Sequence, residues 1–306
     1  MNKIKNVILC GMGAVGSVYA YKINEYSKLN KDIDFKVLVD KERYERYTKT
    51  PILYNDNLLD VKYILPDADE FKADLIIIAT KMSGLNSVLK ELKNFISDNT
   101  VILSLINGVT SEEIVAESYG REKVLYSYFI GHSTVRTGNS VIHDDVNTIV
   151  FGSDNPSDEL NVVRVRDFFD KVGINYKIPD DIRHSMWAKF MLNVSANPTT
   201  ALFRMNFGQM LNNEKFMELA KKIMLEVVPI AKAENIKNSE TLVQEVLDNL
   251  KTMSYEGRTS MLQDVEAGRK TENDIFAGAV VKLGKKYNID TTYCSVIDEF
   301  FKVIDN

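Results

Sequence analysis

The chain has 306 residues, 45% of them hydrophobic and 26% charged, and a formal net charge of −5. This composition is typical of a globular protein with a sizeable core and excludes a largely disordered chain, while the length favours two domains over one. The negative charge gives no electrostatic reason to expect a nucleic acid partner, so we expect a small-molecule ligand.

The two cysteines, Cys10 and Cys294, are far apart and lack the spacing of zinc ligands. Neither a disulfide framework nor a metal site is therefore expected. The apolar run of residues 7–11 is too short for the core of a signal peptide, and no segment is long enough to span a membrane. These features favour a cytoplasmic protein.

A glycine-rich motif follows the first predicted strand, residues 7–10. A G-x-G-x-x-G sequence between a strand and a helix, here residues 14–26, is typical of dinucleotide-binding proteins. The first glycine permits a tight turn, the second lets backbone amides approach a pyrophosphate, and the third lets the helix pack against the strand. A purely structural turn is the less favoured alternative. The motif predicts cofactor contacts from Gly11, Met12, Gly13, Ala14, Val15 and Gly16.

Asp40 ends the second predicted strand, residues 35–39. An acidic side chain at this position accepts hydrogen bonds from the adenosine ribose hydroxyls and repels a 2′-phosphate, which favours NAD over NADP. Lys41 and Arg43 follow, and they would favour NADP if their side chains turned toward a 2′-phosphate. The expected cofactor is therefore NAD or NADP, with a modest preference for NAD.

Two further apolar segments, residues 74–79 and 101–105, predict buried parallel strands. They bring Lys81 and Asn107 to the carboxyl edge of the sheet, where open α/β sheets bind their ligands. Lys81 could hold a cofactor phosphate or a substrate carboxylate, or lie in solvent. Asn107 could face the nicotinamide or the substrate, or make an Asx turn.

The pattern of the chain changes at about residue 180. Residues 124–153 predict antiparallel strands that finish the sheet, with turns at 137–139 and 144–145, and residues 158–171 and 173–178 predict a helix and a last strand. Helical periodicity alone follows, at residues 216–234, 239–253, 274–287 and 293–304. We therefore expect an α/β, Rossmann-like dinucleotide-binding domain, residues 1–180, and an all-α substrate and catalytic domain, residues 181–306, with the active site in the interdomain cleft.

Residues 187–200 place an amine and two carboxamides on one helical face. Lys189, Asn193 and Asn197 recur every four residues, so on a helix they form a stripe about 80° wide among apolar neighbours. We expect this stripe to face a pocket; a lysine that snorkels and two asparagines that bond backbone groups are the alternative. Pro198 predicts a kink or an end of the helix near Asn197.

A second polar helical segment is predicted at residues 257–274. Ser260, Gln263 and Asp264 bring polar groups into this segment, and Glu272 lies twelve positions after Ser260. A surface helix with capping residues and paired charges is the alternative.

Together these motifs resemble the ketopantoate reductase family over nearly the whole chain. The resemblance rests on G-M-G-A-V-G at residues 11–16, T-K at 80–81, I-N-G at 106–108, W-x-K-x3-N-x3-N-P at 187–198 and T-S-M-L-Q-D at 259–264 followed by T-E at 271–272.

Membership would imply hydride transfer from a reduced nicotinamide to the ketone of a 2-oxo acid, by default the reduction of 2-dehydropantoate to (R)-pantoate in pantothenate biosynthesis. By the resemblance, Lys189 is the general acid, Glu272 lies near the nicotinamide ribose and this lysine, and Lys81 lies near the cofactor. The substrate-binding residues that it implies are Asn107, Asn193, Asn197 and Ser260; Asn107 also contacts the cofactor.

Three positions depart from the family pattern. Asp40 stands where NADPH-dependent members commonly carry an arginine, and Phe207 and Gly257 stand where substrate-side asparagines are often found. The loss of two hydrogen-bond donors favours a less polar 2-oxo acid. The alternative function is an NADH-dependent D-2-hydroxyacid dehydrogenase acting on branched or aromatic 2-oxo acids, and an alternative of another class is a non-catalytic dinucleotide-binding or sensing protein. The C-terminal helices could also bury an apolar face in a homodimer, and the alternative is that the same periodicity fills an intramolecular core.

Overall fold

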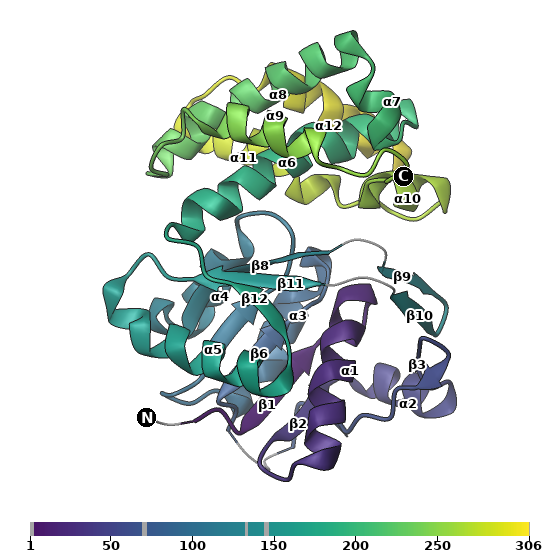
Figure 1. The fold of residues 1–306 in the computed structure, drawn as a ribbon, viewed down its shortest axis with the longest axis vertical. Coiled ribbons are helices and arrows are strands. Elements are labelled where there is room, and N and C mark those ends of the chain that lie inside the picture. The colour runs from purple at the N-terminus through teal and green to yellow at the C-terminus, as the bar shows by residue number, and fades with distance from the viewer. Residues whose placement is uncertain (1–2, 69–71, 132–133, 144–146, 306) are drawn as a thin grey trace. The chain divides into compact units, whose positions relative to one another are not determined.

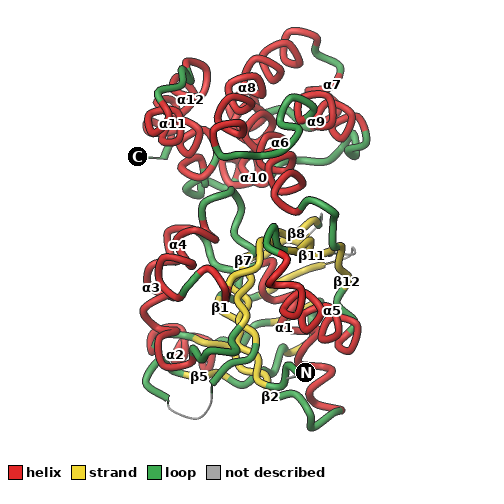
Figure 2. Tube along the Cα trace, turned by 90° about the vertical axis from the view of Figure 1, so that its left-hand side faces the viewer, coloured by secondary structure: helices red, strands yellow, loops and turns green. Residues whose placement is uncertain are grey.

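The computed structural model describes residues 3–68, 72–131, 134–143 and 147–305, so the turn predicted at 144–145 lies outside the described residues. The chain divides into two compact units, Met1–Ile182 and Arg183–Asn306 (Figure 1). In the described part of the chain the strands belong to the first unit, and the second consists of helices and loops (Figure 2). The expected order of an α/β domain and a helical domain is confirmed.

Within the described residues, eight strands of the first unit form one sheet in the order β12-β11-β8-β7-β6-β1-β2-β5. The six strands from β8 to β5 in this order are parallel, β11 is antiparallel to β8, and β12 is parallel to β11. The strands are β1 Asn6–Cys10, β2 Asp34–Leu38, β5 Tyr63–Ile64, β6 Leu75–Ile78, β7 Val101–Ser104, β8 Val124–Ile130, β11 Thr148–Gly152 and β12 Asn175–Lys177.

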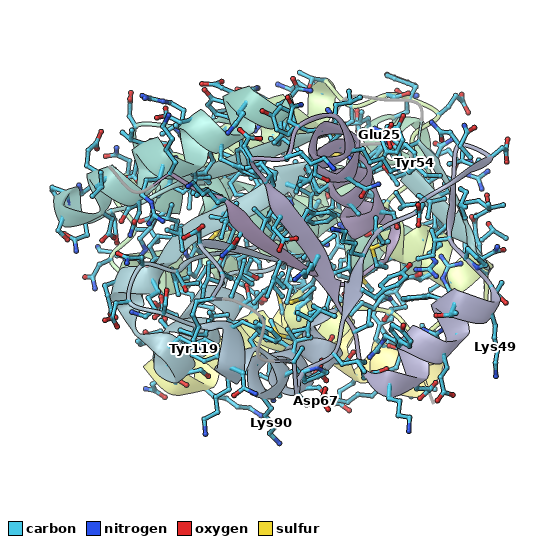
Figure 3. All side chains as sticks on the ribbon, turned by 90° about the horizontal axis from the view of Figure 1, so that it is seen from below. Glu25, Lys49, Tyr54, Asp67, Lys90 and Tyr119 are labelled. Carbon is cyan, nitrogen blue, oxygen red and sulfur yellow. The ribbon has the colours of Figure 1, made fainter. Side chains whose placement is uncertain are left out.

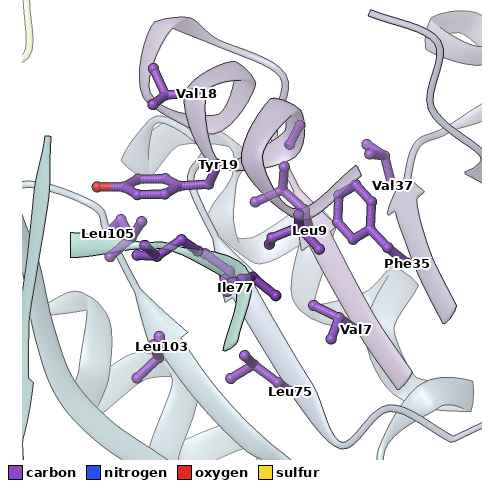
Figure 4. Close-up of a cluster of buried hydrophobic side chains, with 14 of the residues drawn as sticks. Val7, Leu9, Val18, Tyr19, Phe35, Val37, Leu75, Ile77, Leu103 and Leu105 are labelled. Atoms are coloured by element: carbon purple, nitrogen blue, oxygen red, sulfur yellow. The ribbon is translucent and has the colours of Figure 1, made fainter. Parts of the chain in front are cut away.

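Helices cover both faces of this sheet. Helices α1 (Ala14–Leu29) and α5 (Glu159–Val172) lie on one side, and α3 (Met82–Leu92) and α4 (Ser111–Tyr119) lie on the other (Figure 2). Because successive side chains of a strand point to opposite faces, Leu9 packs in the cluster of α1 and Ile8 in that of α3. Figure 4 shows Tyr19 of α1 over this first cluster. A sheet buried on both faces explains the continuous apolar runs in its central strands.

A second sheet of four strands, in the order β4-β3-β10-β9, corrects one prediction. The strands β9 (Thr134–Thr137) and β10 (Ser140–His143) were expected to finish the main sheet, but β10 pairs with β3 (Leu53–Tyr54), which pairs with β4 (Asn57–Leu58). The reason is burial: in β9 half-buried and exposed residues alternate, whereas the main sheet buries both faces of its central strands.

The small sheet is attached to α1 by aromatic side chains. Tyr54 of β3 stacks on Tyr21 of α1, with ring centroids 4.5 Å apart. Figure 3 shows Tyr54 beside α1, the helix that carries Glu25, while charged side chains such as Lys49 and Lys90 project outward from the same unit. The remaining helix of the first unit longer than one turn is α2 (Lys41–Lys49), among the residues that are described.

The second unit is helical, and two of its boundaries differ from the prediction. Helix α6 (Ile182–Phe203) continues through Pro198 instead of ending near Asn197. The hydroxyl of Thr200 donates to the Ala196 carbonyl at 2.6 Å, a side-chain bond in the turn where proline removes a backbone donor. The other helices are α7 Phe207–Leu211, α8 Glu214–Ala233, α9 Leu242–Lys251, α10 Ser260–Glu266, α11 Ala277–Tyr287 and α12 Thr292–Ile304.

Helix α10 is also much shorter than the predicted segment 257–274. It ends at Glu266, and Gly268 follows with φ +63°, the left-handed conformation typical of a helix end. Residues 267–272 form a loop, so Glu272 lies outside the helix that carries Ser260.

Candidate functional site

The glycine-rich turn connects β1 to α1, and two of its glycines are required by the backbone. Gly11 has φ +103°, and a Cβ atom on it would lie 2.5 Å from the carbonyl oxygen of Ala79. A Cβ atom on Gly16 would lie 1.9 Å from the carbonyl oxygen of Gly11. Larger residues at these two positions would push α1 away from the sheet.

Gly13 has a different environment, because a Cβ atom there would meet nothing within 4 Å. Gly13 is also the N-cap residue of α1, it supplies no side-chain cap, and the first turn of the helix holds no acidic residue. Backbone N–H groups at such a helix start carry a partial positive charge and suit a phosphate. The turn therefore suits the pyrophosphate of a dinucleotide, because there is open space beside Gly13 and the helix start carries a partial positive charge.

Asp40 follows β2, the strand next to β1, and caps the N-terminus of α2. Its carboxylate accepts a hydrogen bond from the backbone N–H of Arg43 at 2.6 Å and also pairs with the Arg43 guanidinium. Arg43 is thus bound to Asp40, and the two charges offset each other at the end of β2. A 2′-phosphate at this position would compete with Asp40 for the same arginine.

Lys81 and Asn107 lie at the same edge of the sheet as the glycine-rich turn. Cys10 of β1 is in register with Ile78 of β6, which is in register with Ser104 of β7, and all three strands are parallel. Lys81 is exposed at the N-cap position of α3, and Asn107 is half-buried in the loop before α4. The first unit therefore brings together residues 11–16, Asp40, Lys81 and Asn107.

A buried carboxyl group close to this edge was missed from the sequence. Glu112, in the first turn of α4, accepts a hydrogen bond from the Ser111 hydroxyl at 2.8 Å, and the Ser104 hydroxyl donates to that of Ser111 at 2.8 Å. Burial raises the pKa of Glu112 from 4.5 to about 7, although hydrogen bonds from Ser111 and the Ser127 backbone act in the opposite direction. A glutamate in the first turn of a helix is ordinarily exposed, so nothing in the local sequence signals this burial.

The second unit joins three of the predicted polar residues. Asn197, only 6% exposed, accepts hydrogen bonds at its Oδ1 from the Ser260 hydroxyl at 3.0 Å and the Met261 backbone N–H at 3.3 Å. Its Nδ2 donates to Oδ1 of Asn193 at 3.2 Å. Thr200 and Thr259 hydroxyls, 2.8 Å apart, make a second link between α6 and the start of α10. The polar chain therefore runs from Asn193 through Asn197 to Ser260.

Lys189 lies one turn before Asn193 on α6 and is half-buried. Trp187, Phe190, Met191 and Val194 around it are buried, as expected for a mostly apolar helix. Lys189 therefore has buried apolar neighbours on both sides of the polar stripe, unlike a lysine on an ordinary solvent-exposed helix.

Glu272 lies in the loop after α10, between Thr271, which is bonded to the C-cap residue of α12, and Asn273, which is bonded to α12 itself. The backbone N–H of Thr271 donates to Oδ1 of Asp305 at 2.9 Å, and its hydroxyl donates to Oδ2 at 2.6 Å. On the other side, Nδ2 of Asn273 donates to Oδ1 of Asp298 at 2.9 Å. Glu272 is therefore held by a loop that is anchored on both sides.

The two residues that replace the expected asparagines contact each other. The backbone N–H of Phe207 donates to the Gly257 carbonyl at 3.0 Å, and a Cβ atom on Gly257 would lie 3.0 Å from Cδ2 of the Phe207 ring. Phe207 is 9% exposed. The pair forms a compact apolar contact where hydrogen-bond donors were expected.

The chain is similar to known proteins over most of its length. The family model described as ketopantoate reductase PanE/ApbA matches residues 7–156, and the model of its C-terminal part matches residues 181–305. A relative from Streptococcus pyogenes serotype M3, named 2-dehydropantoate 2-reductase, is 26% identical over 300 residues, which cover 96% of this chain and 95% of the relative.

Two solved structures are similar in fold. The ternary structure of D-mandelate dehydrogenase with NADH and anilino(oxo)acetate has a TM-score of 0.85 at 19% identity. A dimeric ketopantoate reductase from Staphylococcus aureus has a TM-score of 0.76 at 23% identity. In both comparisons 98% of each chain is covered.

Proposed function

Since this chain belongs to the ketopantoate reductase family of oxidoreductases, we propose that it reduces the ketone of a 2-oxo acid with NADH or NADPH. The default substrate is 2-dehydropantoate and the product is (R)-pantoate. The observation that carries this proposal within the second unit is the polar chain from Asn193 to Ser260 on the same face of α6 as Lys189.

The first unit holds the cofactor in this proposal. The open space beside Gly13 and the uncapped start of α1 receive the pyrophosphate, and Asp40 accepts hydrogen bonds from the adenosine ribose. Lys81 and Asn107, at the ends of β6 and β7, contact the rest of the cofactor, with Asn107 also reaching the substrate. The bound cofactor supplies the hydride.

Lys189 supplies the proton. When the ketone carbon accepts the hydride, its oxygen becomes an oxyanion that needs both a proton and a nearby positive charge, and an ammonium group provides both. Glu272 lies near this lysine and the nicotinamide ribose in the proposed complex. The anchored loop suits that role, because it restricts the positions that the Glu272 carboxylate can take.

The amides of α6 orient the substrate. Oδ1 of Asn193 already accepts a bond from Asn197, so the NH2 group of Asn193 is the donor available to a bound acid. Ser260 binds the substrate carboxylate in this scheme. Its hydroxyl group must then donate its hydrogen bond to the carboxylate instead of to Oδ1 of Asn197. The Met261 N–H continues to satisfy Asn197 when this happens.

The contact between Phe207 and Gly257 supports a second candidate, an NADH-dependent D-2-hydroxyacid dehydrogenase for branched or aromatic 2-oxo acids. Two hydrogen-bond donors are replaced by an aromatic ring and a glycine, so the hydroxyl group of 2-dehydropantoate would lose partners while an apolar side chain would gain contact.

A spectrophotometric assay that follows oxidation of NADH and NADPH separates these candidates. Each cofactor is paired with 2-dehydropantoate, with 2-oxoisovalerate and with an aromatic 2-oxo acid. Highest kcat/KM with 2-dehydropantoate supports the first candidate, and highest kcat/KM with NADH and an apolar acid supports the second. Tight cofactor binding without turnover of any 2-oxo acid would contradict both and favour a sensing protein.

We also propose a second copy of the chain as a partner. Helix α12 exposes Tyr293, Val296, Phe300 and Val303, whose spacing places them on one helical face. An exposed apolar stripe of this kind is typical of an interface, and the Staphylococcus aureus relative is described as dimeric.

A further inference from the structure

Arg136 of β9 is bonded to the glycine-rich turn, although the two segments are 124 residues apart in the chain. Its Nη1 donates to the carbonyl oxygen of Met12, the residue between the first two glycines of the motif. Its Nε donates to the carbonyl of Gly138 at 3.0 Å, which holds the side chain against its own hairpin. The small sheet therefore delivers an arginine to the proposed phosphate-binding turn.

Both acceptors are neutral carbonyls, so in the described parts of the chain these two bonds do not compensate the charge of the guanidinium. Beyond the two bonds the guanidinium has three further N–H groups. Such a fixed, planar fork of donors matches the oxygens of a phosphate better than any other side chain does. Its half-buried positive charge also makes the electrostatic potential beside the turn more positive, which favours binding of an anion.

Arg136 also lies close to the helix that Asp40 caps. Its Cζ atom is 6.0 Å from the ring centroid of Tyr47, on α2. Its charge acts on Tyr63 of β5, where it opposes the burial that raises the pKa of this tyrosine to about 12. The guanidinium therefore contacts both the glycine-rich turn, which binds the pyrophosphate in Rossmann-like domains, and α2, whose N-cap residue Asp40 occupies the ribose-binding position.

We propose that Arg136 binds a phosphate group in the adenosine half of the cofactor, either the pyrophosphate or a 2′-phosphate. The inference rests on the dinucleotide binding included in the proposed function. It adds a cationic contact to a motif that otherwise offers backbone N–H groups, and it gives the small sheet a role in cofactor binding. The bond to Met12 holds the guanidinium in place before the cofactor arrives.

The test uses the full chain and titrates NADH and NADPH by fluorescence. Arg136→Gln keeps an amide that can donate to Met12 but removes the charge, and Arg136→Lys keeps the charge. We expect Arg136→Gln to weaken cofactor binding about tenfold or more, since hydrogen bonds to charged groups are strong, and Arg136→Lys to recover much of the loss. The loss should shrink as salt concentration rises.

Arg46→Gln is the matched control. Arg46 lies over the same Tyr47 ring, at 5.1 Å from its centroid, and pairs with Glu42 on the exposed face of α2. Its substitution should change cofactor affinity less than twofold. Thermal unfolding without cofactor is measured for each variant, because a purely structural bond to Met12 would lower stability without a charge-dependent loss of affinity.

The outcomes are distinct. Equal weakening for NADH and NADPH assigns Arg136 to the pyrophosphate, and weakening for NADPH alone assigns it to the 2′-phosphate. Unchanged affinity for both cofactors in Arg136→Gln would overturn the inference while leaving the proposed function intact. If the unaltered protein bound neither cofactor, the proposed function would fail as well.

Discussion

At the scale of single residues, Lys189 is the group on which the proposed chemistry depends. It shares a helical face with Asn193 and Asn197, and large side chains on the same helix are buried. A lysine that merely extended its charge into solvent would need no such polar neighbours. Kinetic measurements distinguish a catalytic lysine from one that only reaches solvent.

We expect Lys189→Ala to lower kcat by a factor of about 100 or more, since positioned acids contribute this much to proton transfer, while NADH affinity stays within about twofold. Steady-state kinetics and a binding titration measure the two quantities. Lys215→Ala, which removes an 85% exposed lysine side chain from α8, is the control. Unchanged turnover in Lys189→Ala would rule out its role as the acid.

The choice of cofactor is also decided by single residues. Asp40 caps α2 and pairs with Arg43, so Asp40→Asn keeps the cap and removes the charge. We expect the ratio of NADPH to NADH affinity to rise about tenfold, because a repulsive charge is lost and Arg43 becomes available to a 2′-phosphate. Asp34→Asn, at the other end of β2, should leave the ratio unchanged. An unchanged ratio in Asp40→Asn would show that the 2′-position of the adenosine ribose does not lie beside Asp40.

At the scale of elements, α4 begins with a carboxyl group that is buried against the sheet. The hydroxyls of Ser104 and Ser111 lead to Glu112, and the Ser127 backbone N–H also donates to it at 3.4 Å. These bonds partly compensate for burial but do not abolish its effect on the pKa. The junction of β7 and α4 should therefore respond to pH.

The sign of this response follows from linkage. Below pH 4.5 Glu112 is protonated in both states; above it the unfolded chain ionises, while the folded protein keeps the proton until about pH 7. The free energy of unfolding should therefore fall by about 3 kcal/mol between these values and stay level above them. Denaturant unfolding between pH 4.5 and 7 should show that the free energy of unfolding falls in the unaltered protein but not in Glu112→Gln.

Glu113→Gln, which changes the neighbouring exposed residue, is the control and should keep the profile of the unaltered protein. Parallel profiles for Glu112→Gln and the unaltered protein would show that Glu112 ionises at the same pH in the folded and unfolded states.

At the scale of the whole molecule, the apolar stripe on α12 is the feature that points beyond a single chain. Val296, Phe300 and Val303 are 51%, 54% and 78% exposed. Isolated exposed apolar residues are common, but a row of them along one helical face is not. In the described residues no helix is long and apolar enough to cross a membrane.

We expect the protein to be a homodimer in solution and Phe300→Glu to shift it toward a monomer, because a charge in an apolar interface loses its hydration. Light scattering after size-exclusion chromatography measures the mass of each variant. Leu29→Glu, at an 85% exposed position on α1, is the control and should remain dimeric. A monomeric unaltered protein at micromolar concentration would contradict the expectation.

The sequence by itself determined the features that depend on local patterns. Parallel strands whose carboxyl ends meet at one edge are predicted by apolar runs that are followed by glycine, Asp40, Lys81 or Asn107. A polar stripe on a helix is predicted by the four-residue spacing of Lys189, Asn193 and Asn197. Periodicity and turn chemistry act over a few residues, so these expectations required no knowledge of long-range contacts.

Only the tertiary structure decided where distant segments meet. The bond from Arg136 to Met12, the burial of Glu112 and the link from Asn197 to Ser260 join residues that no local pattern connects. In the hairpin β9–β10, half-buried and exposed residues alternate along β9, and the hairpin lies outside the main sheet. Helix α6 continues through Pro198 in a stretch where Asn197 and Thr199 are buried. Packing free energy depends on all neighbours at once, and at Pro198 it overrode the local preference for a helix end.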